Sequence, residues 1–213
     1  MTLGWDNPTA DATTTVLLRH GDTQLSPEHR FCGRFDLPLS ANGARQAKAA
    51  AGRLASGAPI DVVVSSPLLR AVATAAIAAG ELGLTVVIDD DLCETSFGDW
   101  EGFTLEEVQQ RWPAAAADWR RDPEQAPPGG ESFADTSRRV DRACERLLRD
   151  YGGQTVLVVS HVTPIKIMLC RALGAPLSAL YRLYLGSACI NEIQWYGPGF
   201  AAVHRVNDTS HLP

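Results

Sequence analysis

Short apolar runs that alternate with stretches of helical periodicity constrain the fold of this chain most strongly. Runs rich in valine, leucine and threonine indicate buried strands. Strands that are apolar throughout are typical of a sheet covered by helices on both faces. The expected strands are Thr13–Arg19, Asp61–Ser66, Thr85–Asp89 and Gln154–His161. The predicted fold class is therefore α/β: a three-layer α/β/α sandwich around a mostly parallel central sheet.

Capping residues predict where the helices begin. Ser40 is placed to cap an alanine-rich helix that runs to Ser56. Ser132, with Asp135 three residues later, resembles a capping box for a long helix to about Tyr151. The sequence thus predicts both the start and the approximate end of these two helices.

Two more helices are expected where a hydroxyl residue precedes a proline. Ser66 is predicted to be the N-cap of one, with Pro67 as its first residue. Thr163 with Pro164 is predicted to open the other. Towards the end of the chain, "CINEIQWY" and "AAVHRVN" alternate like the strands of a hairpin around "GPG".

One domain, residues 13–213, is expected to carry an insertion. A chain of 213 residues, 45% of them hydrophobic, can bury a sizeable core. Residues 94–128 are less regular and are predicted to form a cap-like insertion with short helices at Leu105–Arg111 and Pro113–Arg121. Residues 1–12 are small and polar, so we expect a linker or the boundary of an excised segment.

Composition narrows the possible partners. The net charge of −6 argues against bulk attraction to nucleic acid or to anionic lipid, so an anionic ligand would need a few local positive groups. No apolar run is long enough to cross a membrane, and no signal peptide opens the chain. The five cysteines are scattered without a CxxC pattern, which predicts reduced thiols and a cytoplasmic protein.

Charged or polar side chains follow three of the expected strands. Arg19 and His20 end the first strand, Arg70 follows the second, and Ser160 and His161 end the strand near residue 160. Ligands of such sheets bind beyond the carboxyl ends of the strands. Helix N-termini there attract anions, and guanidinium groups bind two oxygens at once. The three strand ends together predict a site for a phosphate-like dianion.

The two histidines predict more than binding, because arginines alone could hold a phosphate. Neutral imidazole is a nucleophile near pH 7, and imidazolium is a donor to a phosphoryl oxygen. We therefore expect one histidine to form a phosphohistidine while the other stabilises the transferring group. A leaving alkoxide needs a proton, and Glu94 is the first candidate, ahead of Asp99 and Glu101 in the same loop.

Each of these residues alone has an ordinary structural explanation, and only their coincidence at three strand ends favours a site. A metal centre is not predicted, because no H-x-x-x-H pattern or acidic cluster accompanies the histidines. A serine nucleophile is not predicted either, because "GGESF" lacks the second glycine of G-x-S-x-G and follows a proline loop.

These motifs together resemble one family. "LLRHGDT", "GRFDLPLSANGARQA", "VVSSPLLRAVATA", "LCETSFGDWEG", "PPGGES" and "VLVVSHVTPIK" resemble, in order, the signature segments of the histidine phosphatase superfamily, the phosphoglycerate-mutase-like branch. The resemblance covers residues 13–206. It implies a phosphoglycerate-mutase-like fold and no metal or organic cofactor.

The resemblance also implies roles for residues of this chain. His20 would be the phosphorylated nucleophile and Glu94 the proton donor. The rest of the phosphate pocket would be Arg19, Arg70 and His161. Further substrate contacts are expected from Thr23, Gly33, Arg34 and the main chain at Val162.

Within the superfamily, the compact segment "CETSFGDWEGFTLEEVQQRW" is similar to the phosphatase branch. We therefore expect a phosphomonoesterase of the acid-phosphatase type that acts on a small phosphorylated metabolite. The alternatives are a phosphoglycerate-mutase-type phosphotransferase and a non-catalytic phosphate-binding module. More narrowly, the chain resembles the α-ribazole-phosphatase-like domain that actinobacterial proteins fuse to ribonuclease H. That resemblance implies a fused ribonuclease H domain in the full-length protein and no direct nucleic-acid binding by this domain.

The expected substrate pocket is shaped by residues 24–35 and 100–128. Its basic groups are Arg34, Arg111, Arg120 and Arg121. Its aromatic groups are Trp100, Phe103, Trp112 and Trp119, for which a place in the core is favoured over a role as substrate platform.

Overall fold

A computed structural model describes residues 12–197 and 200–212. Nearly all of the predicted linker, residues 1–12, lies outside the described residues, as do two residues of the "GPG" turn. The central sheet has six strands in the order β3-β2-β4-β1-β5-β6. They are β1 (Thr13–Arg19), β2 (Val62–Ser65), β3 (Val86–Ile88), β4 (Thr155–Ser160), β5 (Ile190–Gly197) and β6 (Phe200–Asp208).

The sheet is mostly parallel, as predicted. Strands β1 to β4 pair in parallel, and the β5–β6 hairpin adds an antiparallel edge beside β1. Because β4 lies between β1 and β2, the residues that follow these three strands come together at one edge of the sheet. The topology alone therefore makes neighbours of segments that are distant in sequence.

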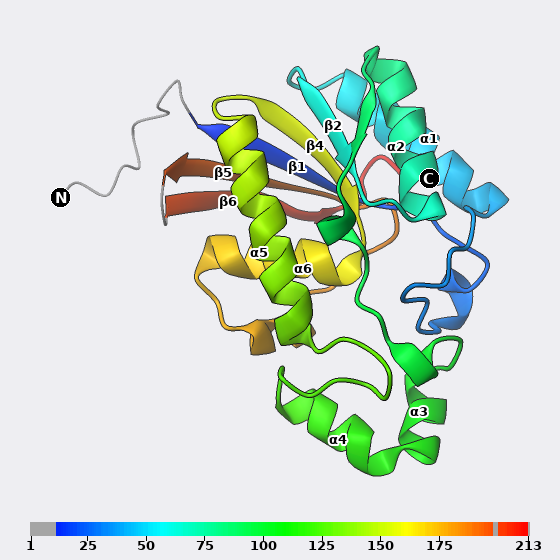
Figure 1. The fold of residues 1–213 in the computed structure, drawn as a ribbon. Coiled ribbons are helices and arrows are strands. Elements are labelled where there is room, and N and C mark those ends of the chain that lie inside the picture. The colour runs from blue at the N-terminus through cyan, green and yellow to red at the C-terminus, as the bar shows by residue number, and fades with distance from the viewer. Residues whose placement is uncertain (1–11, 198–199, 213) are drawn as a thin grey trace.

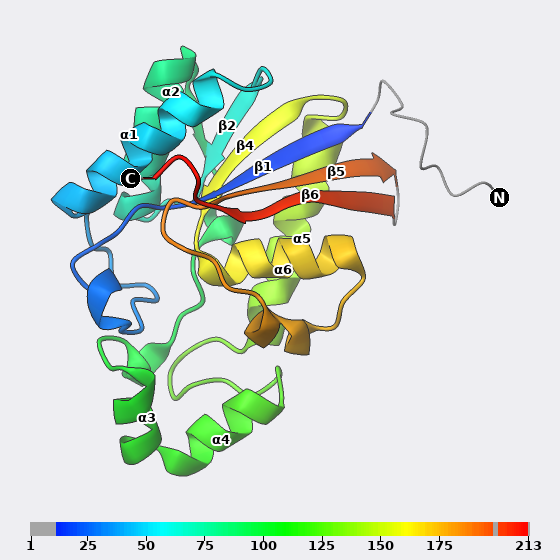
Figure 2. The same ribbon diagram turned by 180° about the vertical axis from the view of Figure 1, so that it is seen from behind.

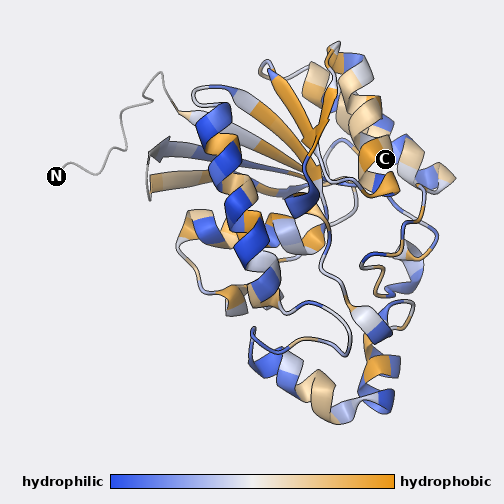
Figure 3. Cartoon of the chain, viewed as in Figure 1, coloured by the Kyte–Doolittle hydropathy of each residue, from blue (hydrophilic) through white to orange (hydrophobic). Residues whose placement is uncertain are grey.

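Helices cover both faces of the sheet, which confirms the three-layer α/β prediction (Figures 1 and 2). Helices α1 (Ala41–Ala55) and α2 (Leu69–Leu82) pack on one face, against Leu18 of β1. Helices α5 (Phe133–Asp150) and α6 (Val162–Leu173) pack on the other, against Leu17. Figure 3 shows apolar strands between these layers and a largely hydrophilic outer surface on α5.

The segment 94–128 contains the two predicted short helices, α3 (Leu105–Arg111) and α4 (Pro113–Arg121). Both lie away from the sheet, at one end of the molecule (Figure 1). Trp100 and Trp119 are buried in the core, with ring centroids 5.5 Å apart, so the core prediction is confirmed for both. The rings of Phe103 and Trp112 pack edge to face, with their centroids 5.6 Å apart, and the Arg111 guanidinium lies over the Phe103 ring. Short 3-10 helices occur at Ser26–Glu28, Asp90–Leu92, Gly98–Trp100 and Leu177–Arg182.

The predicted caps of α1 and α5 are confirmed. The Ser40 hydroxyl accepts the Gly43 N–H of α1. The Ser132 hydroxyl accepts the Asp135 N–H, and the Asp135 carboxylate accepts the Ser132 N–H in return, which completes the capping box of α5.

The prediction that Ser66 caps α2 and that Pro67 is its first residue is wrong. The helix begins at Leu69, whose N–H is accepted by Asp36 Oδ1 at 2.7 Å, so a carboxylate from a distant loop satisfies the helix end. The Ser66 hydroxyl instead contacts His161. Helix α6 also begins one residue before the predicted Thr163, with His161 at its N-cap position.

All five cysteines are free thiols, as predicted; Cys32 is half-buried and the other four are buried. Burial raises the pKa of the Cys144 thiol to about 12, so this side chain stays protonated. Within the described ranges, no helix has the length and apolar character needed to cross a membrane.

Candidate active site

The five predicted catalytic residues converge at the carboxyl edge of β1, β2 and β4. His20 directly follows β1, and its N–H is accepted by the Ser160 carbonyl at 3.0 Å. His161 directly follows β4, so the two imidazole rings lie with their centroids 5.0 Å apart. Glu94 lies two residues after the short 3-10 helix that follows β3. Its carboxylate accepts the N–H of Thr163, which is two residues beyond His161. The structure thus brings together residues separated by as many as 142 positions in the sequence.

Hydrogen bonds fix the tautomer of His20. Its Nδ1 lies 2.7 Å from the Gly21 carbonyl oxygen, which can only accept, so Nδ1 carries the proton. Its Nε2 lies 3.2 Å from the Nε–H of Arg70, which can only donate, so Nε2 carries the lone pair. His20 therefore presents a nucleophilic nitrogen next to a guanidinium group.

Burial and neighbouring cations keep both histidines neutral. Desolvation, together with the charges of Arg19 and Arg70, holds the pKa of His20 well below 6.5, although the hydrogen bond to Gly21 opposes this. Desolvation likewise lowers the pKa of His161. Repulsion between the protonated forms of the two histidines and from Arg70, Arg19 and Arg139 lowers it further. A neutral imidazole has a free lone pair, so His20 is nucleophilic at neutral pH.

Arg70 is almost fully buried, at 1% exposure, which is uncommon for a charged side chain near a helix N-terminus. Its Nη1 donates to the Phe35 carbonyl at 2.7 Å, and its Nη2 donates to the Gly33 carbonyl at 2.8 Å. With its Nε directed at His20, Arg70 ties the loop 33–35 to the nucleophile. The predicted contact residue Gly33 thus lies at the site, held through its carbonyl.

Arg19 supplies a second cation, which is half-buried. Its Nη1 donates to the Leu185 carbonyl at 2.7 Å. Its Nε is buried and has no hydrogen-bond partner in the described part of the chain. An unsatisfied buried donor is costly, so this N–H is well suited to an anionic ligand.

His161 is held by a residue that the sequence analysis had assigned to another role. The Ser66 Oγ lies 2.7 Å from His161 Nε2, and its hydroxyl also accepts the Leu68 N–H at 3.4 Å. His161 Nδ1 is buried and finds no partner among the residues described. Ser66 therefore orients the second histidine and leaves one ring nitrogen for a ligand.

Glu94 is buried, at 7% exposure, and its carboxylate has few contacts. Oε1 accepts the Thr95 N–H at 2.8 Å, and Oε2 accepts the Thr163 N–H at the long distance of 3.4 Å. Another acidic candidate, Glu101, accepts the N–H groups of residues 34, 35 and 97, so its carboxylate holds the loop in place. Of the two glutamates, Glu94 is the one whose carboxylate keeps room for another partner.

The remaining predicted contact residues surround this centre. Thr23 is buried, and its hydroxyl lies 3.2 Å from that of Ser26. Arg34 is partly exposed and donates to Glu131 at 3.2 Å. Val162 is the first residue of α6, where backbone N–H groups lack an intrahelical acceptor. Ligand contacts by these residues stay predictions.

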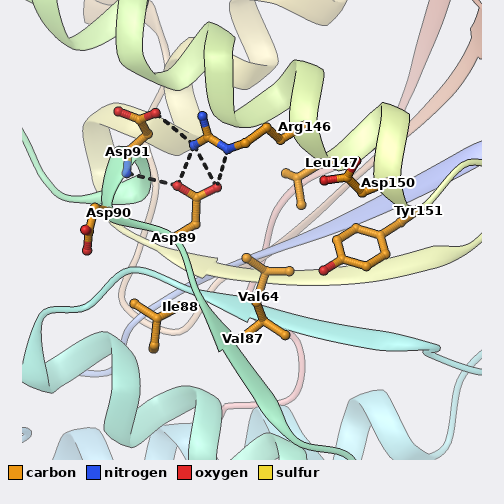
Figure 4. Close-up of a pocket in the computed structure, with 10 residues that line it drawn as sticks. All are labelled: Val64, Val87, Ile88, Asp89, Asp90, Asp91, Arg146, Leu147, Asp150 and Tyr151. Atoms are coloured by element: carbon orange, nitrogen blue, oxygen red, sulfur yellow. Dashed lines mark hydrogen bonds and ion pairs between the residues drawn. The ribbon is translucent and has the colours of Figure 1, made fainter.

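Two pockets are lined in part by residues of the segment 88–96. One, of about 670 Å³, is open and is lined by residues on both sides of Glu94, namely Cys93 and Ser96, together with Arg34 and Glu131. The other, of about 410 Å³, lies between β3 and α5 and contains none of the predicted site residues (Figure 4). In that second pocket Arg146 bridges Asp89 and Asp91 at 2.6 and 2.8 Å.

The residues that support the site were not predicted from the sequence. Ser66 lay in a quoted motif but was assigned to a cap, and Glu131 lay in "PPGGES" without an assigned role. Arg139, whose guanidinium donates to the Glu94 carbonyl, lay in no motif at all. Motif position was a usable signal for Ser66 and Glu131, whereas Arg139 is identified only by its long-range contacts.

The arrangement can bind and polarise a phosphoryl group beside a nucleophilic imidazole, with a carboxyl group near enough to supply a proton. Arg19 and Arg70 supply the positive charge. Over residues 12–197 and 200–212, no three or more His, Cys, Asp or Glu side chains gather as ligands for a metal ion.

Known proteins with similar sequences point to the same chemistry. Residues 15–209 match the model of the histidine phosphatase superfamily, branch 1. The chain is 49% identical over 209 residues to the bifunctional protein Rv2228c of Mycobacterium tuberculosis, which covers 98% of this chain and 57% of that protein. It is 33% identical over 181 residues to the adenosylcobalamin/α-ribazole phosphatase of Escherichia coli, covering 83% and 87%.

The fold is shared as well. The solved structure of mycobacterial glucosyl-3-phosphoglycerate phosphatase Rv2419c matches with a TM-score of 0.84 and 31% identity, over 93% of this chain and 100% of that one. The chain spans little more than half the length of Rv2228c, 57%, whereas it spans nearly the whole of the two phosphatases. Sequence and fold together place it: the chain belongs to the histidine phosphatase superfamily, branch 1.

Proposed function

We propose that this protein is a phosphomonoesterase of the acid-phosphatase type that acts through a phosphohistidine at His20 on a small phosphorylated metabolite. The observation that carries the proposal is the state of His20: a buried neutral imidazole whose Nε2 lone pair points at a buried guanidinium. A histidine with a purely structural role would not need two cations and a second neutral histidine around its unprotonated Nε2.

The reaction follows from the positions of the side chains. A phosphoryl oxygen that accepts from Arg70 Nε–H would bring phosphorus next to His20 Nε2, because the two nitrogens lie 3.2 Å apart. Nε2 attacks, the ester P–O bond breaks, and Glu94 protonates the leaving oxygen. Arg19, Arg70 and His161 stabilise the charge on the other oxygens. Glu94 then accepts a proton from the water that hydrolyses the N–P bond, which releases phosphate and restores His20.

The rest of the substrate is proposed to lie in the open pocket beside Glu94, since the leaving oxygen must face the proton donor. In this proposal Arg34 lines that pocket, Thr23 and the Val162 N–H add phosphate contacts, and the segment 94–128 acts as the cap. The related phosphatases are named for two different metabolites, adenosylcobalamin/α-ribazole and glucosyl-3-phosphoglycerate, which supports the phosphatase class without selecting a substrate.

Two further expectations belong to the proposal. The reaction needs no metal, because the arginines supply the charge that a cation would otherwise provide. The second expectation is that the full-length protein carries a fused ribonuclease H domain. The name of Rv2228c, a bifunctional protein, and its greater length are consistent with this expectation. This domain itself, with a net charge of −6, does not bind nucleic acid directly.

The test compares His20→Ala with His204→Ala, a control on an exposed histidine of β6, using p-nitrophenyl phosphate. His20→Ala should lose about a thousandfold or more in kcat, as expected for a missing nucleophile, and His204→Ala should keep wild-type activity. The wild type should also keep its activity after dialysis against EDTA and should yield a trapped, acid-labile phosphoprotein that His20→Ala does not form.

Three results would contradict the proposal. Retained hydrolysis by His20→Ala would remove the phosphohistidine. Isomerised product without released phosphate would indicate the phosphotransferase. Binding of inorganic phosphate with no turnover of any phosphomonoester would indicate a non-catalytic module.

A further inference from the structure

We propose that Arg139 is a positioning residue for Glu94 and that it acts through the backbone of residues 91–94. The inference rests on the proposed function, in which Glu94 is the proton donor. Arg139 lies on α5, and its side chain is only 8% exposed. No motif includes it, yet every nitrogen of its guanidinium group is engaged.

The guanidinium binds three carbonyl groups within four residues. Nη1 donates to the carbonyl oxygens of Asp91 and Cys93, at 2.8 and 2.6 Å. Nη2 donates to the carbonyl oxygen of Glu94 at 2.9 Å. Because the guanidinium is rigid and planar, these bonds fix the direction of the backbone from which the Glu94 side chain branches.

Glu131 holds the same segment from the other side of Glu94. Its Oε1 accepts from Arg139 Nε at 3.0 Å, and its Oε2 accepts from Arg139 Nη2 at 3.1 Å and from the Ser96 N–H at 2.8 Å. Burial disfavours the Glu131 carboxylate, but the hydrogen bonds of Arg139 and Ser96 outweigh it and lower its pKa. Arg139 and Glu131 together clamp the backbone on both sides of the proton donor.

The clamp matters because little else positions the Glu94 carboxyl group. Among the residues described, the Glu94 carboxylate accepts one hydrogen bond besides that of the adjacent Thr95 N–H, the 3.4 Å bond from the Thr163 N–H. The backbone around it is irregular after the short 3-10 helix that ends at Leu92. Proton transfer requires hydrogen-bond reach, and a displacement of about 1 Å can lower a rate about a hundredfold.

The experiment measures kcat and KM of Arg139→Gln on two substrates, p-nitrophenyl phosphate and phenyl phosphate. The first has a good leaving group that hardly needs protonation, and the second has a poor one. We expect kcat on phenyl phosphate to fall about tenfold to a hundredfold, kcat on p-nitrophenyl phosphate to fall less than about threefold, and KM to stay constant on both. Adding Arg139→Gln to Glu94→Gln should cause no further loss on phenyl phosphate.

Arg142→Gln is the matched control, because Arg142 lies on the same helix and is exposed. In the described part of the chain it donates to the Asp91 side chain and to a carbonyl of its own helix, and not to the backbone of residues 91–94. It should keep the wild-type ratio of the two rates. If Arg139→Gln does not fold, Glu131→Gln is measured instead, and the same selective loss is expected.

Equal loss on both substrates, or full additivity with Glu94→Gln, would overturn the positioning role. Both outcomes differ from a failure of the proposed function, in which the wild type itself hydrolyses neither substrate.

Discussion

At the residue scale, the site depends on ionisable groups that are held away from water. His20 and His161 are 6% and 0% exposed, and Arg70 is 1% exposed. Burial disfavours the charged imidazole, while the arginines cannot give up their protons and so remain charged. The same environment that makes His20 a nucleophile must therefore make the folded protein sensitive to acid.

The first prediction concerns this sensitivity. Below pH 6.5 the unfolded chain protonates His20 and His161, whereas the folded chain, with both pKa values lowered, does not. The free energy of unfolding is therefore highest above about pH 7 and falls as the pH drops below 6.5, by up to about 1.4 kcal/mol per pH unit for each histidine. Urea unfolding between pH 7.5 and 5.5, above the range of most carboxylates, measures the slope.

Substitution of one histidine measures how much that residue contributes to the slope of the free energy of unfolding against pH. His161→Asn should have a shallower slope than the wild type, whatever its absolute stability, and His204→Asn on the surface should keep the wild-type slope. Identical slopes in wild type and His161→Asn would mean that His161 is not held neutral in the folded protein.

The sequence predicted which residues converge at the candidate site, but it did not predict which residues hold them in position. His20, Arg70 and His161 follow strands, so their meeting point could be derived from the fold class. The partner of His161, Ser66, lies 95 positions away, and Glu101 reaches three N–H groups across the loop. Such contacts depend on side-chain directions that local patterns do not contain.

At the element scale, the loop after β1 lies directly on helix α1. A Cβ added at Gly21 would lie 2.3 Å from the Gly43 carbonyl oxygen, and one added at Gly43 would lie 2.0 Å from the Asp22 carbonyl oxygen. Gly21 is absent from the glycines with positive φ, so the close approach of the Gly43 backbone explains why a glycine stands there. The Asp22 carbonyl also accepts the Ser40 N–H at 2.8 Å, just before α1.

The second prediction uses two glycines of the same helix. Gly43→Ala should lower the free energy of unfolding by about 1–3 kcal/mol and reduce activity, because the added methyl group displaces the backbone two residues after His20. Gly52→Ala meets no atom within 4 Å and should instead raise stability by about 1 kcal/mol. Denaturant unfolding of both variants measures the difference, and a neutral Gly43→Ala would show that the helix can move away from the loop at little cost.

Element boundaries were predictable where the capping residue adjoins its helix. Ser40 and Ser132 each cap the residues that follow them, and both starts were predicted correctly. The start of α2 was missed, since its cap comes from Asp36, 33 positions earlier. The same cap positions Arg70, the next residue of the helix, whose guanidinium donates to the carbonyl of Phe35, the residue before Asp36.

At the scale of the whole molecule, the site joins segments that lie far apart in the sequence. The order β2-β4-β1 brings three strand ends together. Helix α2 adds Arg70, the segment 91–96 adds Glu94, and α6 adds the backbone N–H groups of its first turn. Alternation of strands and helices predicted a mostly parallel sheet with ligands beyond its strand ends, but it did not predict the strand order. The position of α3 and α4 relative to that edge was not predictable, because it depends on packing of Trp100 and Trp119 in the core.

The last prediction follows from this convergence. An oxyanion that binds Arg19, Arg70 and both histidines binds the folded chain only, so it stabilises the whole molecule and not one element. At a concentration 100 times its Kd, inorganic phosphate or vanadate should raise the free energy of unfolding by about 2.7 kcal/mol. For a chain of 213 residues this corresponds to about 5–10 °C in Tm.

Calorimetry should show the shift in the wild type and in His204→Ala but not in Arg70→Ala. Chloride at equal ionic strength should give no such shift. An equal rise in Arg70→Ala would mean that the anion binds elsewhere, whereas its loss there would show that one buried guanidinium couples the anion to the stability of the entire fold.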